Sequence, residues 1–351
     1  MPAEGIDAPR VTEWLRANVA GVEPPLRFDR IAGGSSNLTF AVTDAGGRRW
    51  VLRRPPLSHV LASAHDMGRE HRIIAALRPT PVPVPDALGL CEDESVNGSP
   101  FYVMRFVEGS VLRTAAETEG ILDEGGRRRA GEDLVDVLVA LHGVDVDAVG
   151  LGDLARRDGY IERQLKRWHG QFLRSQAQER EAGVHRPVPI VEEVHERLLA
   201  RVPAQREVVV AHGDYRLDNT IVGPDGAVRA VLDWELCTLG DPLGDLGTLL
   251  MYWADPDDDR AAGRLRPSTG LPGFPTRSEV ARRYAAGSGR DIADLGYYVA
   301  FAHWRLACIL EGVYARYAAG AMGADRSRAA MVADQVGRRA EAAVRALATA
   351  T

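Results

Sequence analysis

The residues best placed for chemistry are two aspartates and an asparagine in the segment 211–235. Asp214 and Asp233 each follow a short apolar run, and Asn219 lies five residues after Asp214 and 14 residues before Asp233. A hard divalent cation such as Mg²⁺ prefers oxygen ligands, which Asn219 and Asp233 could supply. Asp214 would then be free to orient a hydroxyl and accept its proton. Phosphoryl transfer needs both parts, a positioned base and a cation on the phosphates.

These aspartates also have a purely structural interpretation. Asp is common in turns and helix caps, where its side chain accepts backbone N–H groups, and Asp214, Asp218 and Asp233 could all act in that way. A lone His-Gly-Asp would favour that interpretation. The complete spacing, in which the Asn is followed by a turn and by a strand that ends in Asp233, favours catalysis.

The first third of the chain is predicted to consist of strands and one helix that position these residues. Apolar and polar residues alternate over 38–43, and Trp50 to Arg53 begins a second strand. Apolar residues recur at helical spacing between residues 66 and 77. The apolar run 101–107 predicts a buried strand that ends at Glu108-Gly109, where we place the seam between two parts of the chain.

The remainder of the chain is predicted to be mainly helical. The pattern predicts helices from about residue 128, over 159–180, over 190–201 and through most of 243–349. Short apolar strands at 208–210 and 230–232 lead directly into the segments of Asp214 and Asp233. Each of the two aspartates should therefore follow a short apolar strand.

Composition excludes several classes of protein. The 351 residues are 45% apolar and 26% charged, which is typical of a folded domain rather than a disordered or fibrous chain. The charge of 43 − 49 = −6 argues against a general nucleic-acid binder. Three widely spaced cysteines, no signal-peptide pattern and no apolar run long enough for a bilayer predict a reduced, cytoplasmic protein without a membrane partner.

His212-Gly213-Asp214, Asn219 and Asp233 resemble the catalytic and metal-binding loops of the aminoglycoside phosphotransferase/choline kinase family. The resemblance implies an α+β, bilobal protein-kinase-like fold. Its N-terminal nucleotide-binding lobe, residues 1–107, would hold a small antiparallel sheet and one helix. Its catalytic and acceptor-binding lobe, residues 108–351, would be larger and mostly helical. In this family, Asp214 would be the catalytic base, while Asn219 and Asp233 would hold Mg²⁺.

The N-terminal part carries further matches to the family. Gly33 to Asn37 (GGSSN) resembles its short phosphate loop, in which backbone N–H groups contact phosphate oxygens, so the resemblance implies nucleotide contacts for Gly34, Ser35, Ser36 and Asn37. Arg53 stands where such kinases place a phosphate-binding Lys, and Glu70 stands where its ion-pair partner belongs. Arg is larger than Lys and binds differently, and Arg54 is an adjacent alternative for the same role.

Two other segments acquire roles from the resemblance. The stretch from Phe101 to Gly109 would form the connection between the lobes, with Met104, Phe106 and Val107 against adenine. Asp245, in the segment 239–247, would brace the catalytic loop through backbone hydrogen bonds. Asp241 would either cap a helix or face the acceptor.

A narrower resemblance covers residues 51–56, 63–77, 100–109, 212–219 and 232–242. These segments are similar to bacterial members of the family and to the kinase-like domains fused to acyl-CoA dehydrogenases. That subgroup is associated with hydroxylated acyl-CoA substrates. The match specifies the fold and the phosphate donor better than it specifies the acceptor.

The acceptor should lie between the catalytic loop and the C-terminal helices, and it remains open. Candidate contacts are Tyr215, Arg216, Trp234, Glu235, Trp304 and Arg305, although Trp and Tyr are more often core residues in helical proteins. The acidic run 255–259 could face a polycationic aminoglycoside. Basic residues of the helix over 159–180 could face a CoA phosphate. For both groups, solvated surface is the simpler interpretation.

Two functions follow. The first is a Mg²⁺-dependent O-phosphotransferase that moves the γ-phosphoryl group of ATP or GTP to a hydroxyl of a small molecule, such as an aminoglycoside, an amino-alcohol or a hydroxyacyl-CoA. The alternative is a non-catalytic nucleotide-binding module of the pseudokinase type, which the Arg at position 53 motivates. The presence of Asp214, Asn219 and Asp233 together favours the enzyme.

Overall fold

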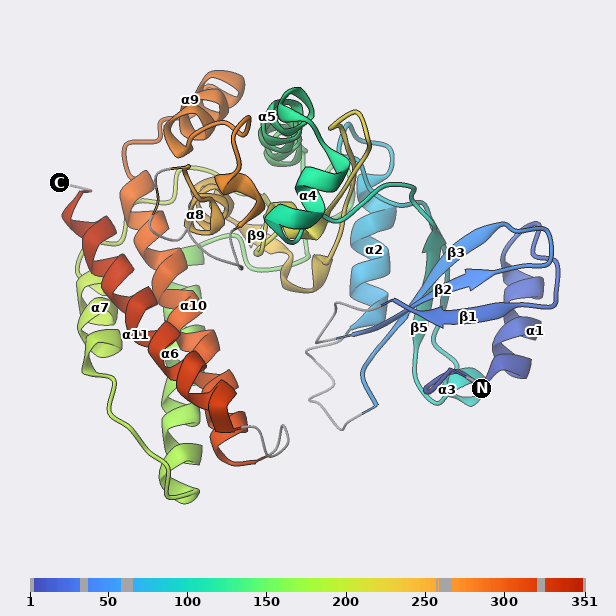
Figure 1. Cartoon of the computed structure of the whole chain (residues 1–351), viewed down its shortest axis with the longest axis horizontal. Helices are drawn as coiled ribbons and strands as arrows, with labels where there is room; N and C mark the ends of the chain where they lie inside the picture. Colours follow the sequence, from blue (N-terminus) through green and yellow to red (C-terminus); the bar gives the residue numbers. More distant parts are fainter. Residues whose placement is uncertain are drawn as a thin grey trace.

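The computed structural model describes residues 3–31, 37–57, 66–256, 258, 267–320 and 326–349. It shows the α+β fold that the sequence predicts, with a small antiparallel sheet at one end and a larger helical part at the other (Figure 1). The boundary between residues 107 and 108 stays a prediction. No helix in the described ranges is both long and apolar enough to cross a membrane.

The N-terminal sheet is built from five strands in the order β1-β2-β3-β5-β4 with antiparallel neighbours. The strands are β1 (Arg27–Arg30), β2 (Leu38–Thr43), β3 (Arg49–Arg54), β4 (Ala87–Cys91) and β5 (Phe101–Arg105). Helix α1 (Ala8–Asn18) covers one face and α2 (Met67–Leu77) lies on the side of the helical part (Figure 1). The short α3 (Glu94–Asn97) precedes β5.

Strand β3 shows how the sheet separates two cores. Successive side chains of a strand point to opposite faces. Trp50 and Leu52 therefore pack in the core beneath α1, whereas Val51 packs with Ile74 of α2 in the core that continues into the helical part. The face of Val51 is thus the face that meets the rest of the protein.

The connection between the two parts is short and held at its far end. After β5 the chain passes through residues 106–109, and Ser110 then exchanges two backbone hydrogen bonds of 2.9 Å with Val222. Gly109 has a φ of +143°, and a Cβ there would lie 2.6 Å from Ile221 Cγ2 and 2.7 Å from the Val222 carbonyl oxygen. Only glycine fits this crossing without displacement.

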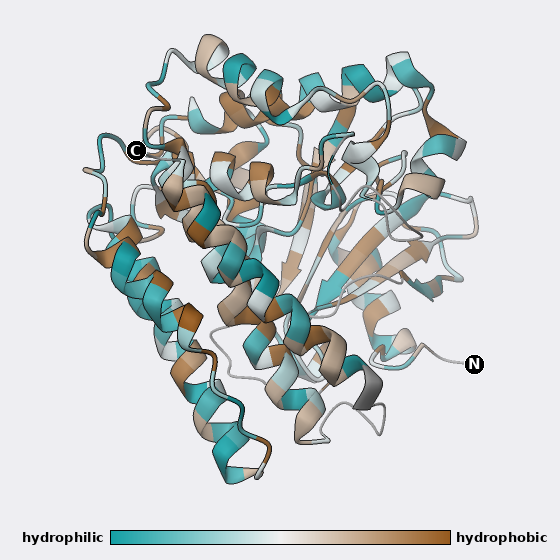
Figure 2. Cartoon of the chain, turned by 60° about the vertical axis from the view of Figure 1, so that its left-hand side comes forward, coloured by the Kyte–Doolittle hydropathy of each residue, from teal (hydrophilic) through white to brown (hydrophobic). Residues whose placement is uncertain are grey.

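The helical part surrounds α10, which packs against α6, α7, α8 and α11. Its helices are α4 (Ala115–Ile121), α5 (Glu124–His142), α6 (Tyr160–Glu181), α7 (Pro189–Leu199), α8 (Pro242–Tyr252), α9 (Arg277–Ser288), α10 (Leu295–Ala318) and α11 (Arg326–Ala348). Figure 2 shows polar residues along the outer faces of the peripheral helices, as the amphipathic patterns require. Helix α8 is buried along nearly its whole length.

Two small strand pairs within the helical part carry the predicted catalytic segments. Strand β6 (Val209–Ala211) pairs with β9 (Thr238–Gly240), and β7 (Thr220–Val222) pairs with β8 (Val228–Val231). Both pairs are antiparallel, and β6 and β8 lie within a residue or two of the strands expected from the sequence. Asp214 and Asp233 follow β6 and β8, as predicted.

Several elements differ from the sequence prediction. The strand expected over 101–107 ends at Arg105, because the residues that follow form the connection between the parts. Helix α5 begins at Glu124 rather than near 128, since Asp123 caps it by accepting the Gly126 N–H. Elements α1, β1 and β4 were not anticipated; β1 in particular is exposed except for the partly buried Phe28 and shows no apolar alternation.

Candidate active site

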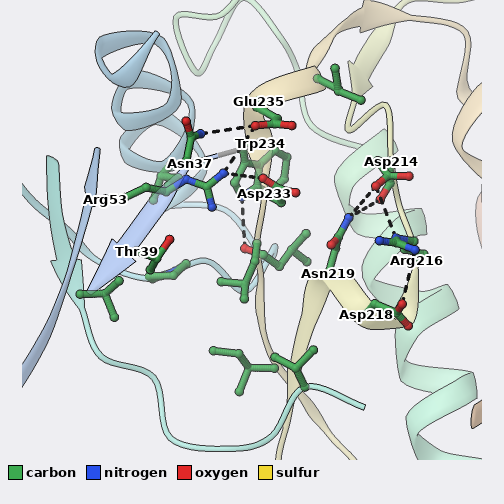
Figure 3. Close-up of a pocket in the computed structure, with 18 of the residues that line it drawn as sticks. Asn37, Thr39, Arg53, Asp214, Arg216, Asp218, Asn219, Asp233, Trp234 and Glu235 are labelled. Carbon is green, nitrogen blue, oxygen red and sulfur yellow. Dashed lines mark hydrogen bonds and ion pairs between the residues drawn. The ribbon is translucent and has the colours of Figure 1, made fainter. Parts of the chain in front are cut away.

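A cavity of about 790 Å³ lies between the sheet and the helical part. Its walls come from β2, β3, β5, the connection after β5, the segments 214–221 and 231–236, and the helices α8 and α10. Figure 3 shows Asp214 and Asn219 on one wall, with Arg53, Asp233 and Glu235 gathered on the other. The cavity therefore contains the residues that the sequence singled out.

The segment that carries Asp214 is held from behind by a buried carboxylate. Asp245 of α8 accepts the His212 N–H at 2.6 Å and the Gly213 N–H at 2.8 Å, which confirms the predicted brace. Burial would raise the pKa of Asp245, but the hydrogen bond from His142 and the neighbouring donors outweigh it and hold the pKa below its usual value. Asp241 is the N-cap of α8, which decides between its two predicted roles.

His212 joins the two catalytic segments. Its Nε2 lies 2.8 Å from the Leu232 carbonyl oxygen, and its Nδ1 accepts the backbone N–H of Asp214 at 3.2 Å. These contacts define the tautomer, because Nδ1 must be unprotonated and Nε2 must carry the proton. The fully buried imidazole thus fixes the segment of Asp214 relative to the residue before Asp233.

Asp214 and Asn219 are joined directly. Asn219, at the end of the 3₁₀ turn Leu217–Asn219, donates from Nδ2 to the Asp214 carbonyl oxygen at 2.8 Å and to Asp214 Oδ2 at 3.0 Å. Arg216 lies between Asp214 Oδ2, at 3.4 Å, and Asp218 Oδ2, at 3.3 Å. Since Nδ2 is engaged, the remaining oxygen of Asn219 is available as an acceptor or a metal ligand.

Asp233 has an unusual backbone. It lies at φ +65° and ψ +59°, directly before the 3₁₀ turn Trp234–Leu236, and it is the only non-glycine residue with positive φ in the described ranges. Such a conformation costs of order 1–3 kcal/mol and is concentrated at functional sites. The strain therefore supports a functional position for this carboxylate.

Arg53 is the centre of an ionic cluster on the opposite wall. Its Nη2 lies 2.5 Å from Asp233 Oδ1 and 3.7 Å from Glu235 Oε2, and its Nε lies 3.1 Å from Glu70 Oε2. Burial would lower the pKa of Arg53, but the charge of Glu70, followed by Tyr102 and Asp233, raises it. One cation among three carboxylates leaves this wall with a negative charge.

Glu70 is almost completely buried on α2 and has two further donors. Asn37 Nδ2 and the Tyr102 hydroxyl each donate to it at 3.0 Å. Burial nevertheless outweighs the charge of Arg53, so the pKa of Glu70 is raised. The Glu70 pairing of Arg53 that the family resemblance implied is therefore present in this structure.

Arg54 points to the other face of the sheet. Its Nη1 donates to the Gly5 carbonyl oxygen and, at 3.1 Å, to the Asn97 carbonyl oxygen. Strand alternation separates Arg53 and Arg54, and only Arg53 lines the cavity. Of the two alternatives, only Arg53 has the geometry for phosphate contact.

The structure places most of the other predicted residues on the cavity. Met104, Phe106, Val107, Arg216, Trp234, Glu235 and Arg305 all line it. Gly34, Ser35 and Ser36 lie outside the described residues. Thr39 and Tyr102 also line the cavity and were not predicted as site residues. The signal for Tyr102 was its hydroxyl in the predicted strand 101–107, and this hydroxyl donates to Glu70.

Tyr215 and Trp304 do not line this cavity. Both side chains are fully buried: the Tyr215 hydroxyl donates to the Leu134 carbonyl oxygen at 2.7 Å, and Trp304 Nε1 donates to the Val191 carbonyl oxygen at 3.0 Å. Their polar atoms are satisfied within the core, where they support the helical part.

The cavity suits a hard divalent cation. An amide oxygen of Asn219 and the carboxylate of Asp233 are the ligand types that Mg²⁺ prefers, and the surrounding carboxylates add negative charge. Two protein ligands are also what Mg²⁺ commonly takes when substrate phosphates and waters complete its shell. The residues present therefore fit the expected metal.

Comparison with known proteins identifies relatives over most of the chain. Residues 27–281 match the model of the phosphotransferase enzyme family. Acyl-CoA dehydrogenase family member 10 of Mus musculus is 36% identical over 299 residues, which are 84% of this chain and 27% of that protein. Family member 11 of Gallus gallus is 34% identical over 309 residues, 86% of this chain and 38% of that protein. The chain thus spans less than half the length of these relatives.

Solved structures share the architecture. A Ralstonia eutropha protein with a provisional aminoglycoside phosphotransferase name superimposes with a TM-score of 0.79 at 33% identity, covering 97% of this chain and 98% of that one. Macrolide 2'-phosphotransferase MphH of Brachybacterium faecium gives a TM-score of 0.58 at 23% identity, over 92% of this chain and 97% of the other. The second likeness concerns the fold alone.

Proposed function

The chain belongs to the phosphotransferase enzyme family, and we propose that it is a Mg²⁺-dependent kinase that transfers the γ-phosphoryl group of ATP or GTP to a hydroxyl of a small molecule. The observation that carries the proposal is the arrangement of Asp214 and Asn219, hydrogen-bonded at 3.0 Å, facing Asp233 across one cavity. It provides a base beside two oxygen ligands.

In the proposed reaction, Asp214 orients the acceptor hydroxyl and takes its proton. The hydroxyl oxygen forms the new bond to the γ-phosphorus while the bond to the bridging oxygen of the nucleoside diphosphate breaks. Asn219 and Asp233 would hold Mg²⁺, which when bound neutralises charge on the phosphates. Arg53 would contact phosphate oxygens, with Glu70 fixing its position.

The nucleotide would occupy the end of the cavity nearest the connection between the two parts. Met104, Phe106 and Val107 provide apolar surface and backbone groups for the base. Asn37, the last residue of the predicted phosphate loop, donates to Glu70 at 3.0 Å, and the phosphate contacts of Gly34, Ser35 and Ser36 stay a prediction. The preference between ATP and GTP is part of the test below.

Charges on the acceptor side support an anionic acceptor. Arg305 is 5% exposed and lines the cavity. Among the described residues, its Nε has no hydrogen-bond partner and no carboxylate pairs with it; Nη2 makes only a long contact of 3.5 Å to Thr248 Oγ1. A buried cation without a counterion is costly, so an acceptor carrying a carboxylate or phosphate would gain from this position.

The acidic run that could have faced a polycation is engaged elsewhere. Asp255 and Asp258 both pair with Arg277, and Asp257 and Asp259 lie outside the described residues. Apolar side chains of Met251, Leu306 and Ile309 accompany Arg305 in the cavity wall. Of the acceptors considered, this wall favours a hydroxyacyl-CoA over an aminoglycoside or an amino-alcohol.

An ADP-release assay tests the proposal. The chain is incubated with Mg-ATP or Mg-GTP and with aminoglycosides, choline, macrolides or hydroxyacyl-CoA compounds, and product formation is verified by mass spectrometry. We expect release that depends on a hydroxyacyl-CoA and disappears in Asp214→Asn. In Arg305→Met, the KM for the acceptor should rise roughly tenfold or more with an unchanged KM for nucleotide. A cationic acceptor as the best substrate would refute the acceptor assignment.

A non-catalytic nucleotide-binding module is the second candidate. The contact that favours it is the Arg53–Asp233 pair, because it occupies an oxygen of the proposed metal ligand. Nucleotide binding measured by calorimetry, with neither acceptor-dependent release nor slow ATP hydrolysis, would favour the module. Slow Mg²⁺-dependent hydrolysis that Asp214→Asn abolishes would favour the kinase.

A further inference from the structure

A second group of metal-ligating side chains lies outside the cavity. It consists of His169 on α6 and of Glu192 and His195 on α7. None of these residues lines the proposed active site. In Figure 1, α6 and α7 lie in the helical part, on the side away from the sheet.

The helices place the three side chains together. Glu192 and His195 are three residues apart on α7 and therefore share a face, and His169 meets them from the neighbouring helix. Their ligand atoms all lie within 4.8 Å of one another, and His169 Nε2 is 2.6 Å from Glu192 Oε2. All three are partly buried, so they are ordered by packing yet accessible to an ion from solvent.

Aromatic packing supports the group from the protein interior. The rings of His169 and His195 stack with centroids 3.8 Å apart and an interplanar angle of 16°. His195 also stacks on the buried Trp304 of α10, at 5.4 Å and 17°. The cluster thus rests on the central helix of this part of the protein, while its three side chains come from α6 and α7.

We propose that His169, Glu192 and His195 form a binding site for a borderline divalent transition-metal cation, foremost Zn²⁺, that links α6 to α7. Two imidazoles and one carboxylate are a common zinc ligand set, and water would complete a four-coordinate shell. Imidazole selects zinc-like ions, whereas Mg²⁺ prefers oxygen ligands. The site is therefore chemically distinct from the proposed Mg²⁺ position at Asn219 and Asp233.

Metal binding requires a defined local rearrangement. Zinc bonds of about 2.0–2.1 Å in a tetrahedral shell need donor separations of roughly 3.3 Å, so the His169–Glu192 contact must widen. One ion cannot lie in the planes of two parallel stacked rings, so one imidazole must turn about its χ2 bond. The ion would replace the His169–Glu192 hydrogen bond and stabilise the folded protein by mass action.

The test uses the full chain without an affinity tag, stripped with chelator and titrated with Zn²⁺ by calorimetry in excess Mg²⁺. We expect one saturable zinc site, a higher melting temperature with zinc, and the visible absorption of tetrahedral Co²⁺ when cobalt is used. His195→Gln and Glu192→Gln should each weaken binding by more than roughly 100-fold, beyond the 10- to 100-fold typical of a lost outer-shell partner. His169→Asn should do the same from the other helix.

Two controls locate the ion. His185→Gln changes a histidine of the same region whose Nε2 pairs with Gln176, and it should bind zinc like the wild type. Asp233→Asn should also retain the zinc affinity, and this result would exclude the proposed Mg²⁺ position as the place where zinc binds. The proposal is wrong if no saturable site is found, or if folded His195→Gln and Glu192→Gln, verified by circular dichroism, bind zinc as the wild type does.

Discussion

The two walls of the cavity are held in different ways. The segment of Asp214 is fixed from behind, because Asp245 and His212 bind its backbone and neither side chain lines the cavity. On the other wall, Arg53, Asp233 and Glu235 hold one another, and all of them face the cavity. A ligand could bind beside Asp214 without breaking the contacts of Asp245 and His212. A phosphate that contacts Arg53 would instead compete with the carboxylates of Asp233 and Glu235.

Two buried carboxylates express the same contrast. The pKa of Asp245 is lowered despite burial, because His142 and backbone N–H groups stabilise its charge. The pKa of Glu70 is raised, because burial outweighs the charge of Arg53. The difference teaches that one wall is preorganised for its charge, while the other keeps a negative charge that a bound cation would help to compensate.

The largest expected effect comes from Asp214→Asn. Removing the proposed base should lower kcat by about 10²–10⁴-fold and leave the nucleotide Kd unchanged, because the brace behind Asp214 does not involve its carboxylate. Steady-state kinetics and calorimetry measure the two quantities. Asp218→Asn, in the same turn, is the matched control and should change kcat far less. Normal turnover in Asp214→Asn would remove the base assignment.

Asp245→Asn tests the preorganised wall. An amide can accept at only one oxygen and presents N–H groups to the backbone donors of His212 and Gly213, so the free energy of unfolding should fall by roughly 3 kcal/mol. Urea unfolding measures this loss, and kcat should fall with it while nucleotide binding is retained. If Asp245→Asn were as stable and active as the wild type, the segment would owe its position to other contacts.

Arg53→Met tests the exchangeable wall. Three carboxylates would be left facing one another, so nucleotide affinity should fall by about 2–3 kcal/mol, or roughly 30- to 150-fold. Calorimetric titration with Mg-ATP gives the value. Arg53→Lys keeps the positive charge and should lose less nucleotide affinity than Arg53→Met. Arg54→Met changes the opposite face of the sheet and should bind nucleotide normally; an equal loss in Arg54→Met would contradict the separation of the two arginines.

The smallest expected effect is the pH dependence of Glu70→Gln. Because the folded pKa of Glu70 is raised, its contribution to stability is complete below its unfolded pKa and is lost as pH rises through the folded value. The stability of the wild type relative to Glu70→Gln should therefore decrease as the pH rises above about 4.5. Urea unfolding of both proteins at several pH values measures this difference. If the stability difference instead increased with pH, the pKa of Glu70 would be lowered and not raised.

Much of this architecture could be predicted from local patterns. Alternation located β2 at residues 38–43, and helical spacing located α2, which begins at Met67 after its cap Asp66. The family resemblance also supplied the brace by Asp245. These features depend on periodicity or on a motif whose residues lie close together in the sequence.

Other features depend on contacts that the sequence does not encode locally. Both faces of β3 are buried, so alternation could not tell whether Arg53 or Arg54 faces the cavity. The sequence left Tyr215 and Trp304 as candidates for the cavity, although core positions are commoner for Tyr and Trp, because the backbone partners of their hydroxyl and indole groups lie far away in the sequence. The exposed β1 offered no apolar pattern at all.

The connection that passes Val222 at Gly109 is the place about which the two parts of the protein could rotate. Residues 106–109 are bounded by β5 on one side and by Ser110, which pairs with Val222, on the other. This short segment therefore offers only a few backbone torsion angles for motion of the sheet relative to the helical part. A connecting segment this short permits the two parts to rotate about it but does not permit them to slide past each other. A swing about it would widen the cavity least beside Phe106 and Val107 and most at the far rim, so the end proposed for adenine would be the pivot and the end proposed for the phosphates would move most.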